Sequence, residues 1–352
     1  MKRSCHLTAS HNSVLEDNGN QPAQEPMASE DEGWNTCTTS ALISIGTHRL
    51  CASISGPARQ DGDPVVIVLP GAGESSSSYP AVQRLVASFA RILLYDRSGL
   101  GRSEDASSRP ATAATAVTAA EELHALLDAL RLTPPYILVA HSYGAIVARE
   151  FLHLRPVDVA GMVLADPASE RQHHYFRIPD PNIAAVLGDL NFARVTGLRD
   201  QAKLSRDEWR VRAADMARGA TGAAHVEAAS FVEVCETLAA KDQCRRRPLG
   251  DKPLSVIRCR SVRDYERIYK AGVEAGNGTE EERRAFRALL DRWDEVGRGL
   301  NEEMLGLSGN GRLVDVPDCG HSVHLVRPDV VAGEVRWVVE SVVGGRGVEV
   351  RL

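Results

Sequence analysis

The segment from Tyr136 to Arg149 constrains the fold of this chain more than any other. It begins with a short apolar run typical of a buried strand, continues through a turn of small residues, and then follows a helical pattern. At the turn, residues 140–144 read A-H-S-Y-G, which matches the pattern G-x-S-x-G with alanine in place of the first glycine. A tight turn between a strand and a helix lifts such a serine clear of the sheet. We therefore predict Ser142 as a nucleophile; the alternative is a serine-containing turn without chemistry.

Around this segment, apolar strand-like runs alternate with amphipathic helical segments. This alternation predicts an α/β architecture, with a mostly parallel eight-stranded sheet covered by helices on both faces. The first two strands are expected to form a hairpin. The expected strands are 41–45, 48–54, 65–69, 91–95, 136–140, 161–165, 253–257 and 312–316. The expected helices are 79–89, 111–130, 144–154, 205–218, 225–240, 279–305 and 330–343.

One long segment interrupts the alternation. After Asp166 the sequence shows charged helical patterns and no strand signal until about Gly250. An insertion of this size over the carboxyl edge of a sheet is expected to form a helical cap. The expected parts are a disordered tail at 1–38, a core at 39–167 and 251–343, the cap at 168–250 and a C-terminal tail at 344–352.

The N-terminal tail is polar and almost without hydrophobic periodicity. A segment with so little apolar content cannot repay the entropy of ordering it, so disorder is expected. Removal of residues 1–36 is therefore expected to leave stability and kinetics nearly unchanged.

Composition excludes several classes of function. The 352-residue chain has a net charge of −6, which favours neither nucleic acid nor an anionic membrane as a partner. Its seven cysteines form no CxxC and no cluster with zinc spacing, so no metal and no cofactor is expected. Without a secretory signal or a membrane-spanning stretch, a cytoplasmic location is expected. The sequence does not indicate an oligomeric state.

A serine hydroxyl needs a base to accept its proton, and His321 is the predicted base. His321 lies in a Gly-His pair in the loop between the last expected strand and the last expected helix. The alternative reading is a surface loop histidine. His324 lies three residues further on, and His141 is expected to pack beside the turn that carries Ser142.

The acid that orients the base has two candidates. Asp166 directly ends the 161–165 strand, whereas Asp264 follows the 253–257 strand after a longer gap. We favour Asp166 because it ends its strand directly and needs no intervening loop to reach His321. We keep Asp264 as the alternative. Either aspartate could instead be a helix cap or a solvated turn residue.

Two backbone N–H groups are needed to stabilise an oxyanion. Tyr143, immediately after the nucleophile, is expected to supply one, and Ala72 in the Pro70-Gly-Ala-Gly73 loop the other. The glycines of this loop do not form a dinucleotide-binding fingerprint, because no third glycine follows at the required spacing.

Four motifs, in this order along the chain, resemble the α/β-hydrolase family over about residues 41–343. They are Leu69-Pro-Gly-Ala-Gly, where that family usually has His-Gly, Asp96-Arg-Ser-Gly-Leu-Gly-Arg-Ser, the turn at 140–144 and Gly320-His321. The family usually carries its acid after the strand that follows the cap, which would favour Asp264. A minority, including some fungal lactonases, place it one strand earlier, which would favour Asp166.

The resemblance implies hydrolysis of an ester, lactone or thioester of a small to medium-sized metabolite through an acyl-serine, with secondary metabolism as one setting. A serine at the turn argues against the epoxide hydrolases and haloalkane dehalogenases of this fold, which attack through a carboxylate. A carbon–carbon lyase and a ligand-binding, receptor-like protein remain alternatives. Substrate-binding residues cannot be assigned, although the cap holds a mixed set of rings, namely His173, His174, Tyr175, Phe176 and Phe192.

Overall fold

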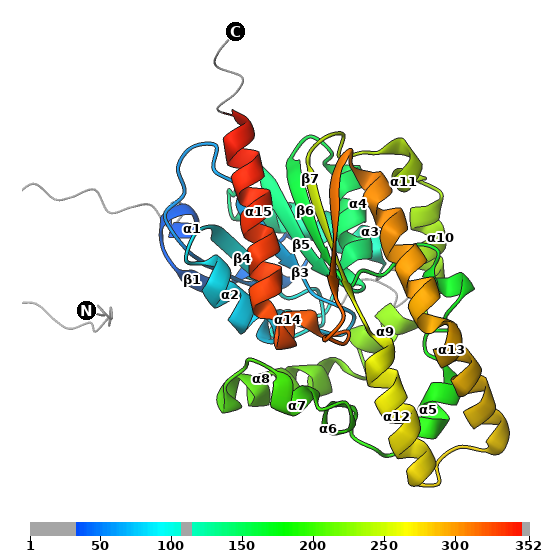
Figure 1. Cartoon of the computed structure of the whole chain (residues 1–352). Helices are drawn as coiled ribbons and strands as arrows, with labels where there is room; N and C mark the ends of the chain where they lie inside the picture. Colours follow the sequence, from blue (N-terminus) through cyan, green and yellow to red (C-terminus); the bar gives the residue numbers. More distant parts are fainter. Residues whose placement is uncertain (1–32, 107–114, 347–352) are drawn as a thin grey trace, which may run out of the picture.

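The computed structural model describes residues 33–106 and 115–346, and its centre is one eight-stranded sheet (Figure 1). The strand order is β1-β2-β4-β3-β5-β6-β7-β8. β2 runs antiparallel to both of its neighbours, and the other neighbouring pairs are parallel. The strands are β1 (Thr39–Ser44), β2 (Arg49–Ser55), β3 (Val65–Leu69), β4 (Arg91–Tyr95), β5 (Tyr136–His141), β6 (Val159–Ala165), β7 (Pro253–Cys259) and β8 (Asn310–Val316). The predicted fold class is confirmed.

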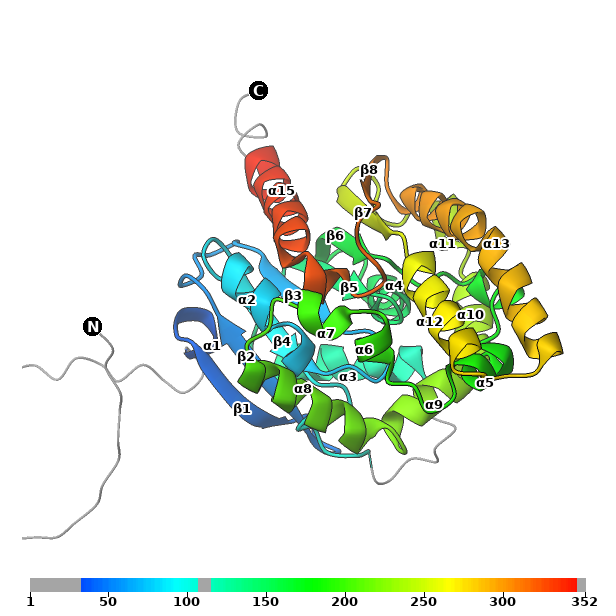
Figure 2. The ribbon, with the colours of Figure 1, turned by 60° about the horizontal axis from the view of Figure 1, so that its bottom comes forward.

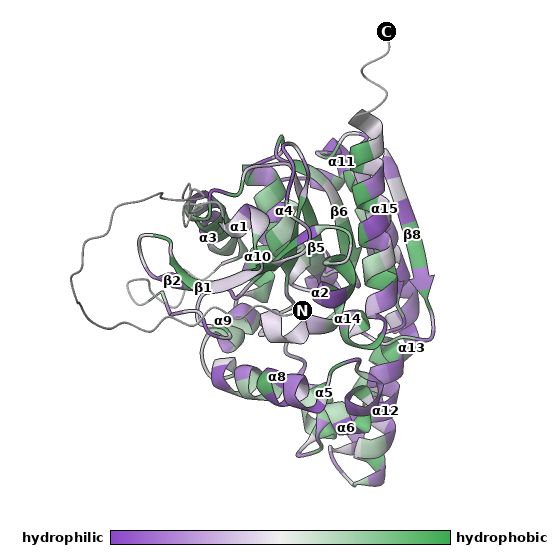
Figure 3. Ribbon diagram, turned by 90° about the vertical axis from the view of Figure 1, so that its left-hand side faces the viewer, coloured by the Kyte–Doolittle hydropathy of each residue, from purple (hydrophilic) through white to green (hydrophobic). Residues whose placement is uncertain are grey.

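Helices cover both faces of the sheet, because both faces of its central strands are apolar. In β3, Val66 and Val68 face α2 and α15, whereas Ile67 faces α3 and α4. The central strands are correspondingly hydrophobic in Figure 3. The covering helices are α2 (Pro80–Val86), α3 (Ala116–Ala129), α4 (Gly144–Leu154), α14 (Val323–Val326) and α15 (Pro328–Arg346).

The cap insertion, which we define as residues 168–250 between β6 and β7, contains helices and no strand. Helices α5 to α9 lie at the carboxyl edge of the sheet, towards the bottom of Figure 1, and Figure 2 shows them from that side. The predicted helix 225–240 is divided at Ser230 into two helices. The helices are η3 (Gln172–His174), α5 (Pro181–Leu187), α6 (Phe192–Val195), α7 (Leu198–Gln201), α8 (Arg206–Gly219), α9 (Ala223–Ala229), α10 (Phe231–Ala239) and α11 (Gln243–Arg246).

A second helical segment, between β7 and β8, packs against the cap insertion. It consists of α12 (Val262–Glu274) and α13 (Glu280–Glu303), and the 3-10 helix η4 (Met304–Leu307) follows. α12 and α13 pack on α5 through a shared apolar cluster that includes Val186, Ile268 and Phe286. The sequence prediction places α12 and α13 in the α/β core at 251–343. Their charged pattern does not show which neighbouring helices cover their apolar faces. The predicted start of α13 is confirmed: the Thr279 hydroxyl accepts the Glu282 N–H at 3.2 Å, and the Glu282 carboxylate accepts the Thr279 N–H at 2.7 Å.

The structure also differs from the prediction at the N-terminal boundary. Residues 33–36 form the short helix α1 (Gly33–Thr36), and the Trp34 side chain is buried. The buried Arg91 guanidinium donates to the Trp34 carbonyl at 2.9 Å and to the Gly56 carbonyl at 2.9 Å. Residues 33–36 therefore belong to the folded domain, which contradicts the predicted disordered tail at 1–38 for these residues. Their removal together with the preceding residues is now expected to lower stability. The predicted tail at 1–32, the helix start at 111–114 and the tail at 347–352 lie outside the described residues.

Candidate active site

The turn between β5 and α4 carries Ser142 at the carboxyl edge of the sheet. Ser142 has a φ of 50°, a left-handed backbone conformation that residues other than glycine rarely adopt. A Cβ atom on Gly144 would lie 2.1 Å from the Leu69 carbonyl oxygen, so only glycine lets α4 pass this close to β3. Ala140, which replaces the first glycine of the pattern, is fully buried at the end of β5. The local sequence thus explains both the sharpness of the turn and the exposure of the serine oxygen above the sheet.

Neighbouring strands bring three loops to this turn. Leu69 at the end of β3 pairs with Ala140, and Ala165 at the end of β6 pairs with His141. The loop after β3 and the first residue after β6 therefore flank Ser142 on either side. The His321 loop, after β8, reaches the same place from further along the sheet edge.

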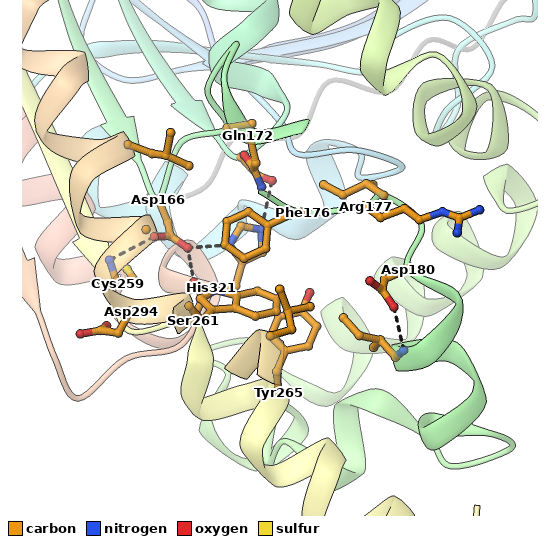
Figure 4. Close-up of a pocket in the computed structure, with 18 of the residues that line it drawn as sticks. Asp166, Gln172, Phe176, Arg177, Asp180, Cys259, Ser261, Tyr265, Asp294 and His321 are labelled. Carbon is orange, nitrogen blue, oxygen red and sulfur yellow. Dashed lines mark hydrogen bonds and ion pairs between the residues drawn. The ribbon is translucent and has the colours of Figure 1, made fainter. Parts of the chain in front are cut away.

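A continuous chain of hydrogen bonds joins Ser142, His321 and Asp166. His321 Nε2 lies 3.0 Å from the Ser142 hydroxyl oxygen, and His321 Nδ1 lies 2.6 Å from Asp166 Oδ2. Figure 4 shows the Asp166 carboxylate directed at the His321 ring. The structure thus brings together the three side chains that the sequence predicts as nucleophile, base and favoured acid.

The surroundings of Asp166 stabilise its ionised form. Its carboxylate accepts the Cys259 N–H at 3.2 Å and the Ser261 hydroxyl (Figure 4). Burial raises the pKa of Asp166, but the hydrogen bonds from His321, Ser261 and Cys259 outweigh it and hold this pKa below its usual value. Burial lowers the pKa of His321, but the Asp166 carboxylate outweighs it and raises this pKa above its usual value. The imidazole is therefore a stronger base than a free histidine.

Asp264, the alternative acid, contacts the same histidine at a different atom. Its carboxylate accepts the His321 backbone N–H at 3.0 Å. A Cβ atom on Gly320 would lie 2.1 Å from the Asp264 carboxylate, so the glycine lets the loop lie against this side chain. Burial raises the pKa of Asp264 above its usual value. Asp264 is thus placed to hold the loop, whereas Asp166 is placed to hold the ring.

The other two histidines near the turn belong to a buried cluster with Glu74. His141 Nδ1 and His324 Nε2 each lie 3.3 Å from a Glu74 carboxylate oxygen, and all three residues are buried. Burial lowers the pKa of His324 to about 4, so this imidazole is neutral near pH 7. His141 Nε2 lies 2.9 Å from the His321 carbonyl oxygen. His141 therefore supports the His321 loop, in agreement with its expected place beside the turn.

This cluster is also the group of described residues with the side-chain chemistry of a metal site. The Glu74 carboxylate already accepts the Arg212 guanidinium at 3.1 Å and the Tyr79 hydroxyl at 3.2 Å. The guanidinium compensates the carboxylate charge, so the electrostatics of the cluster do not require a metal.

The two predicted oxyanion donors, Ala72 and Tyr143, lie on the loop after β3 and on the residue after the nucleophile. Within residues 33–106 and 115–346, neither backbone N–H donates to another protein group. Arg97 holds the preceding part of the loop by donating to the Pro70 and Gly71 carbonyls, each at 2.7 Å. Both amides are thus free to bind a ligand oxygen, and their catalytic role stays a prediction.

Two cavities meet at Ser142 and His321. One, of about 430 Å³, is lined by the aromatic side chains Phe176, Tyr265 and Trp293 (Figure 4). Tyr265 and Trp293 stack with ring centroids 4.2 Å apart and come from α12 and α13, which sequence reasoning did not connect to the site.

The second cavity, of about 930 Å³, lies on the side of the loop after β3 that carries Ala72. It is lined by Ala72, Phe192 and Trp209, together with other residues of the cap insertion. Of the rings noted in the cap sequence, Phe176 and Phe192 therefore line the cavities at Ser142. His173, His174 and Tyr175 line a depression that shares Phe176 with the smaller cavity but does not include Ser142.

Comparison with known proteins agrees with this fold. The model of the alpha/beta hydrolase family matches residues 66–334, and the chain belongs to this family. The chain is 31% identical over 305 residues to an AB hydrolase superfamily protein of Gibberella zeae, which covers 84% of this chain and 92% of that protein. It is 32% identical over 315 residues to a Hormonema carpetanum protein assigned as the transporter efuK. That match covers 88% of this chain but only 44% of the relative's length.

Among solved structures, a protein from Acinetobacter baumannii assigned as a lipase superposes with a TM-score of 0.59. The superposition covers 92% of this chain and all of the other, at 14% identity, and so shows similarity of fold alone. Within the described residues, no helix has the length and apolar character needed to cross a membrane. The comparisons therefore show that the chain is a member of the alpha/beta hydrolase family.

Proposed function

We propose that this protein is a serine hydrolase that cleaves an ester, lactone or thioester of a small to medium-sized metabolite. The observation that carries the proposal is the hydrogen-bonded chain from Asp166 through His321 to Ser142, which lies between two cavities. This arrangement contains the parts required for acyl transfer through a covalent intermediate.

In the first half of the reaction, Ser142 Oγ attacks the carbonyl carbon of the substrate while His321 Nε2 takes the hydroxyl proton. The 3.0 Å separation of these two atoms suits direct proton transfer. Asp166 fixes the ring so that Nδ1 carries hydrogen, and its negative charge stabilises the imidazolium that forms.

The tetrahedral intermediate places negative charge on the former carbonyl oxygen. The N–H groups of Ala72 and Tyr143 stabilise this oxyanion. Collapse breaks the bond to the leaving oxygen or sulfur, which takes the proton from His321. The alcohol of an ester or the thiol of a thioester then departs, whereas the hydroxyl group of an opened lactone stays attached to the acyl chain. A water molecule, deprotonated by His321, then attacks the acyl-serine by the same route and releases the acid.

The two cavities support a substrate with a sizeable group on each side of the scissile bond. An acyl-serine at Ser142 would extend into one cavity, and the leaving group would occupy the other. The rings of Phe176, Tyr265 and Trp293 suit an apolar or aromatic group in the smaller cavity. The choice among ester, lactone and thioester, and a role in secondary metabolism, stay predictions.

A fluorophosphonate probe tests the proposal, because such probes label only an activated serine. We expect rapid labelling of the wild-type protein at Ser142, located by mass spectrometry, and no labelling of the Ser142→Ala variant. A panel of esters, lactones and thioesters, with apolar groups of graded size on either side of the scissile bond, then identifies the substrate class. A wild-type protein that resists the probe and binds ligands without turning them over would instead be a binding protein.

A further inference from the structure

We propose that Glu227, on helix α9 of the cap insertion, positions the oxyanion loop, so that the enzyme is competent only while α9 is seated on the core. The oxyanion loop is defined as residues 70–74. This inference rests on the proposed function, because it assigns a role to a residue outside the reacting groups. Glu227 is a positioning residue and touches no reacting atom.

The first contact is a hydrogen bond to the backbone next to the oxyanion donor. The Gly73 N–H donates to Glu227 Oε2 at 2.7 Å, and the Glu227 side chain is buried. Because Gly73 directly follows Ala72, this bond fixes the peptide plane adjoining the one that carries the Ala72 N–H. A shift of that plane would turn the Ala72 donor away from Ser142.

The second contact connects Glu227 to the other side of the same loop. Arg97 donates to Glu227 at 2.6 Å through Nε and at 2.9 Å through Nη2. The same guanidinium donates to the Pro70 and Gly71 carbonyls. The Glu227 carboxylate therefore binds an N–H group of the loop, while the Arg97 guanidinium paired with it binds two of the loop's carbonyl groups. Since Arg97 is also buried, removal of Glu227 would leave a buried cation without a carboxylate partner.

Steric contact shows that α9 rests directly on the loop. A Cβ atom on Gly73, which has a φ of 66°, would lie 2.8 Å from the Ala224 Cβ atom. A Cβ atom on Gly99, in the loop after β4, would lie 3.0 Å from the Ala223 Cβ atom. Glycines on the core thus face alanines on α9, so the helix packs closely against the core in this position.

A neighbouring helix of the cap insertion holds the end of the loop in the same way. Arg212 on α8 donates to Glu74 at 3.1 Å and to the Ser78 hydroxyl at 3.0 Å. Asp215, also on α8, accepts the Ser75 hydroxyl at 3.1 Å. The cap insertion therefore holds the loop at Gly73 and Glu74, and also holds Ser75, the residue that follows it. If α8 and α9 move away to admit substrate, the loop loses these partners, and closure restores them together with the oxyanion site.

The variants Glu227→Gln and Glu227→Ala test the proposal, with Glu236→Gln and Glu236→Ala as matched controls. Glu236 is an exposed residue of α10 on the same cap insertion. We expect Glu227→Ala to lower kcat on the order of 10²-fold with little change in KM, as for loss of an oxyanion donor. Glu227→Gln retains an oxygen for the Gly73 N–H but loses the charge opposite Arg97, so its loss should be smaller. The controls should match wild type.

A transition-state mimic separates positioning from general support of the fold. A trifluoromethyl ketone forms a hemiketal with the serine whose oxygen occupies the oxyanion site. Its affinity should fall in parallel with kcat in the Glu227 variants, while KM stays nearly constant. A folded Glu227→Ala with wild-type kcat, or a loss expressed only in KM, would overturn the proposal.

Hydrogen exchange of the wild-type protein covers the case in which both Glu227 variants fail to fold. The hydrogen-bonded amides of Gly73, Glu74 and residues 226–229 should open together, with one free energy in increasing denaturant. Exchange of the α9 amides while those of Gly73 and Glu74 stay protected would refute the coupling. Failure of the proposed function is recognised separately, because wild type would then resist the fluorophosphonate probe whatever the behaviour of Glu227.

Discussion

At the scale of single residues, His321 is held at every polar atom. Its ring nitrogens contact Asp166 and Ser142, its backbone N–H donates to Asp264, and its carbonyl oxygen lies next to His141 Nε2. Such complete engagement restricts both the ring and the loop, although 37% of the side chain is exposed. The orientation of a base in a hydrogen-bond chain decides how well it accepts a proton, so these partners define the predictions at this scale.

Replacement of Ser142 by alanine should abolish turnover while leaving the fold intact. The variant loses the proposed nucleophile, and alanine fits the tight turn. We expect a fall in kcat on the order of 10⁴-fold or more. Steady-state kinetics on the best substrate, with circular dichroism as the check of folding, measures this. Substantial residual turnover would rule out covalent catalysis by this serine.

Exchange of each candidate acid for asparagine should give very different results. Asp166→Asn removes the charge at the ring and should lower kcat by roughly 10⁴-fold. Asp264→Asn keeps an oxygen that can accept the His321 N–H, and should cost little activity. The comparison uses kcat of both purified variants, and the opposite ranking would assign the acid to Asp264.

The pH dependence of kcat/KM should report the ionisation of His321. The base works only when Nε2 is unprotonated, so activity falls as the pH drops through the pKa of His321. Because Asp166 raises this pKa above its usual value of 6.5, the acid limb of wild type should lie above about pH 6.5. In Asp166→Asn the raising charge is absent, so the residual activity should have its acid limb at lower pH. An unmoved limb would indicate that another group controls it.

At the scale of elements, the junctions between strands and helices carry the site. The close contact of α4 with β3 depends on Gly144, and the contact of α5 with α12 depends on Gly272, whose Cβ would lie 2.0 Å from the Val186 carbonyl oxygen. Both glycines act through close approach of two backbones. The helices beside the active site are therefore placed by backbone contact as well as by apolar side chains.

Gly144→Ala should destabilise the protein and impair catalysis together. The added methyl would meet the Leu69 carbonyl oxygen, and overpacking of this kind costs about 1–3 kcal/mol. Gly299→Ala on the exposed side of α13, where the added Cβ has no atom within 4 Å, is the matched control. It should stabilise the protein by about 0.5–1 kcal/mol. Urea denaturation measures both changes, and equal effects of the two variants would contradict the argument.

At the scale of the whole molecule, the domain extends further towards the N-terminus than hydrophobic patterning suggests. Trp34 and the backbone around it cover the buried Arg91 at the edge of the core. At the other end of the sheet, α12 and α13 cross to the helices of the cap insertion and complete the cavity at Ser142. Segments far apart in the sequence thus cover the edge of the core, at α1, and the cavity at Ser142, at α12 and α13.

Two truncations should separate the polar tail from the folded domain. Deletion of residues 1–32 should leave stability and kinetics nearly unchanged, because this segment has little apolar content. Deletion of residues 1–38 removes the buried Trp34 side chain and acceptors of Arg91, and should cost about 3 kcal/mol. Thermal unfolding of both truncated proteins measures the difference, and equal melting temperatures would show that α1 contributes nothing.

Much of the fold could be predicted from sequence, because its signals are local. Continuous apolar runs marked the buried strands, and the order of small and apolar residues at 140–144 marked the turn. The pair Thr279 and Glu282 marked the start of α13 through bonds within a single helical turn. These features depend on residues a few positions apart, so backbone geometry and side-chain chemistry alone define them.

The contacts between distant loops were decided only by the tertiary structure. Asp166 and Asp264 were comparable candidates in sequence, but β6 pairs directly with β5, whereas β7 lies one strand further from Ser142. Glu227 was one acidic residue on a charged helix until α9 was placed against Gly73. Sequence therefore determined which residues can form strands, turns and a hydroxyl nucleophile. Which of them meet depends on sheet order and on the packing of helices between strands, because such contacts join residues separated by 57 to 155 positions.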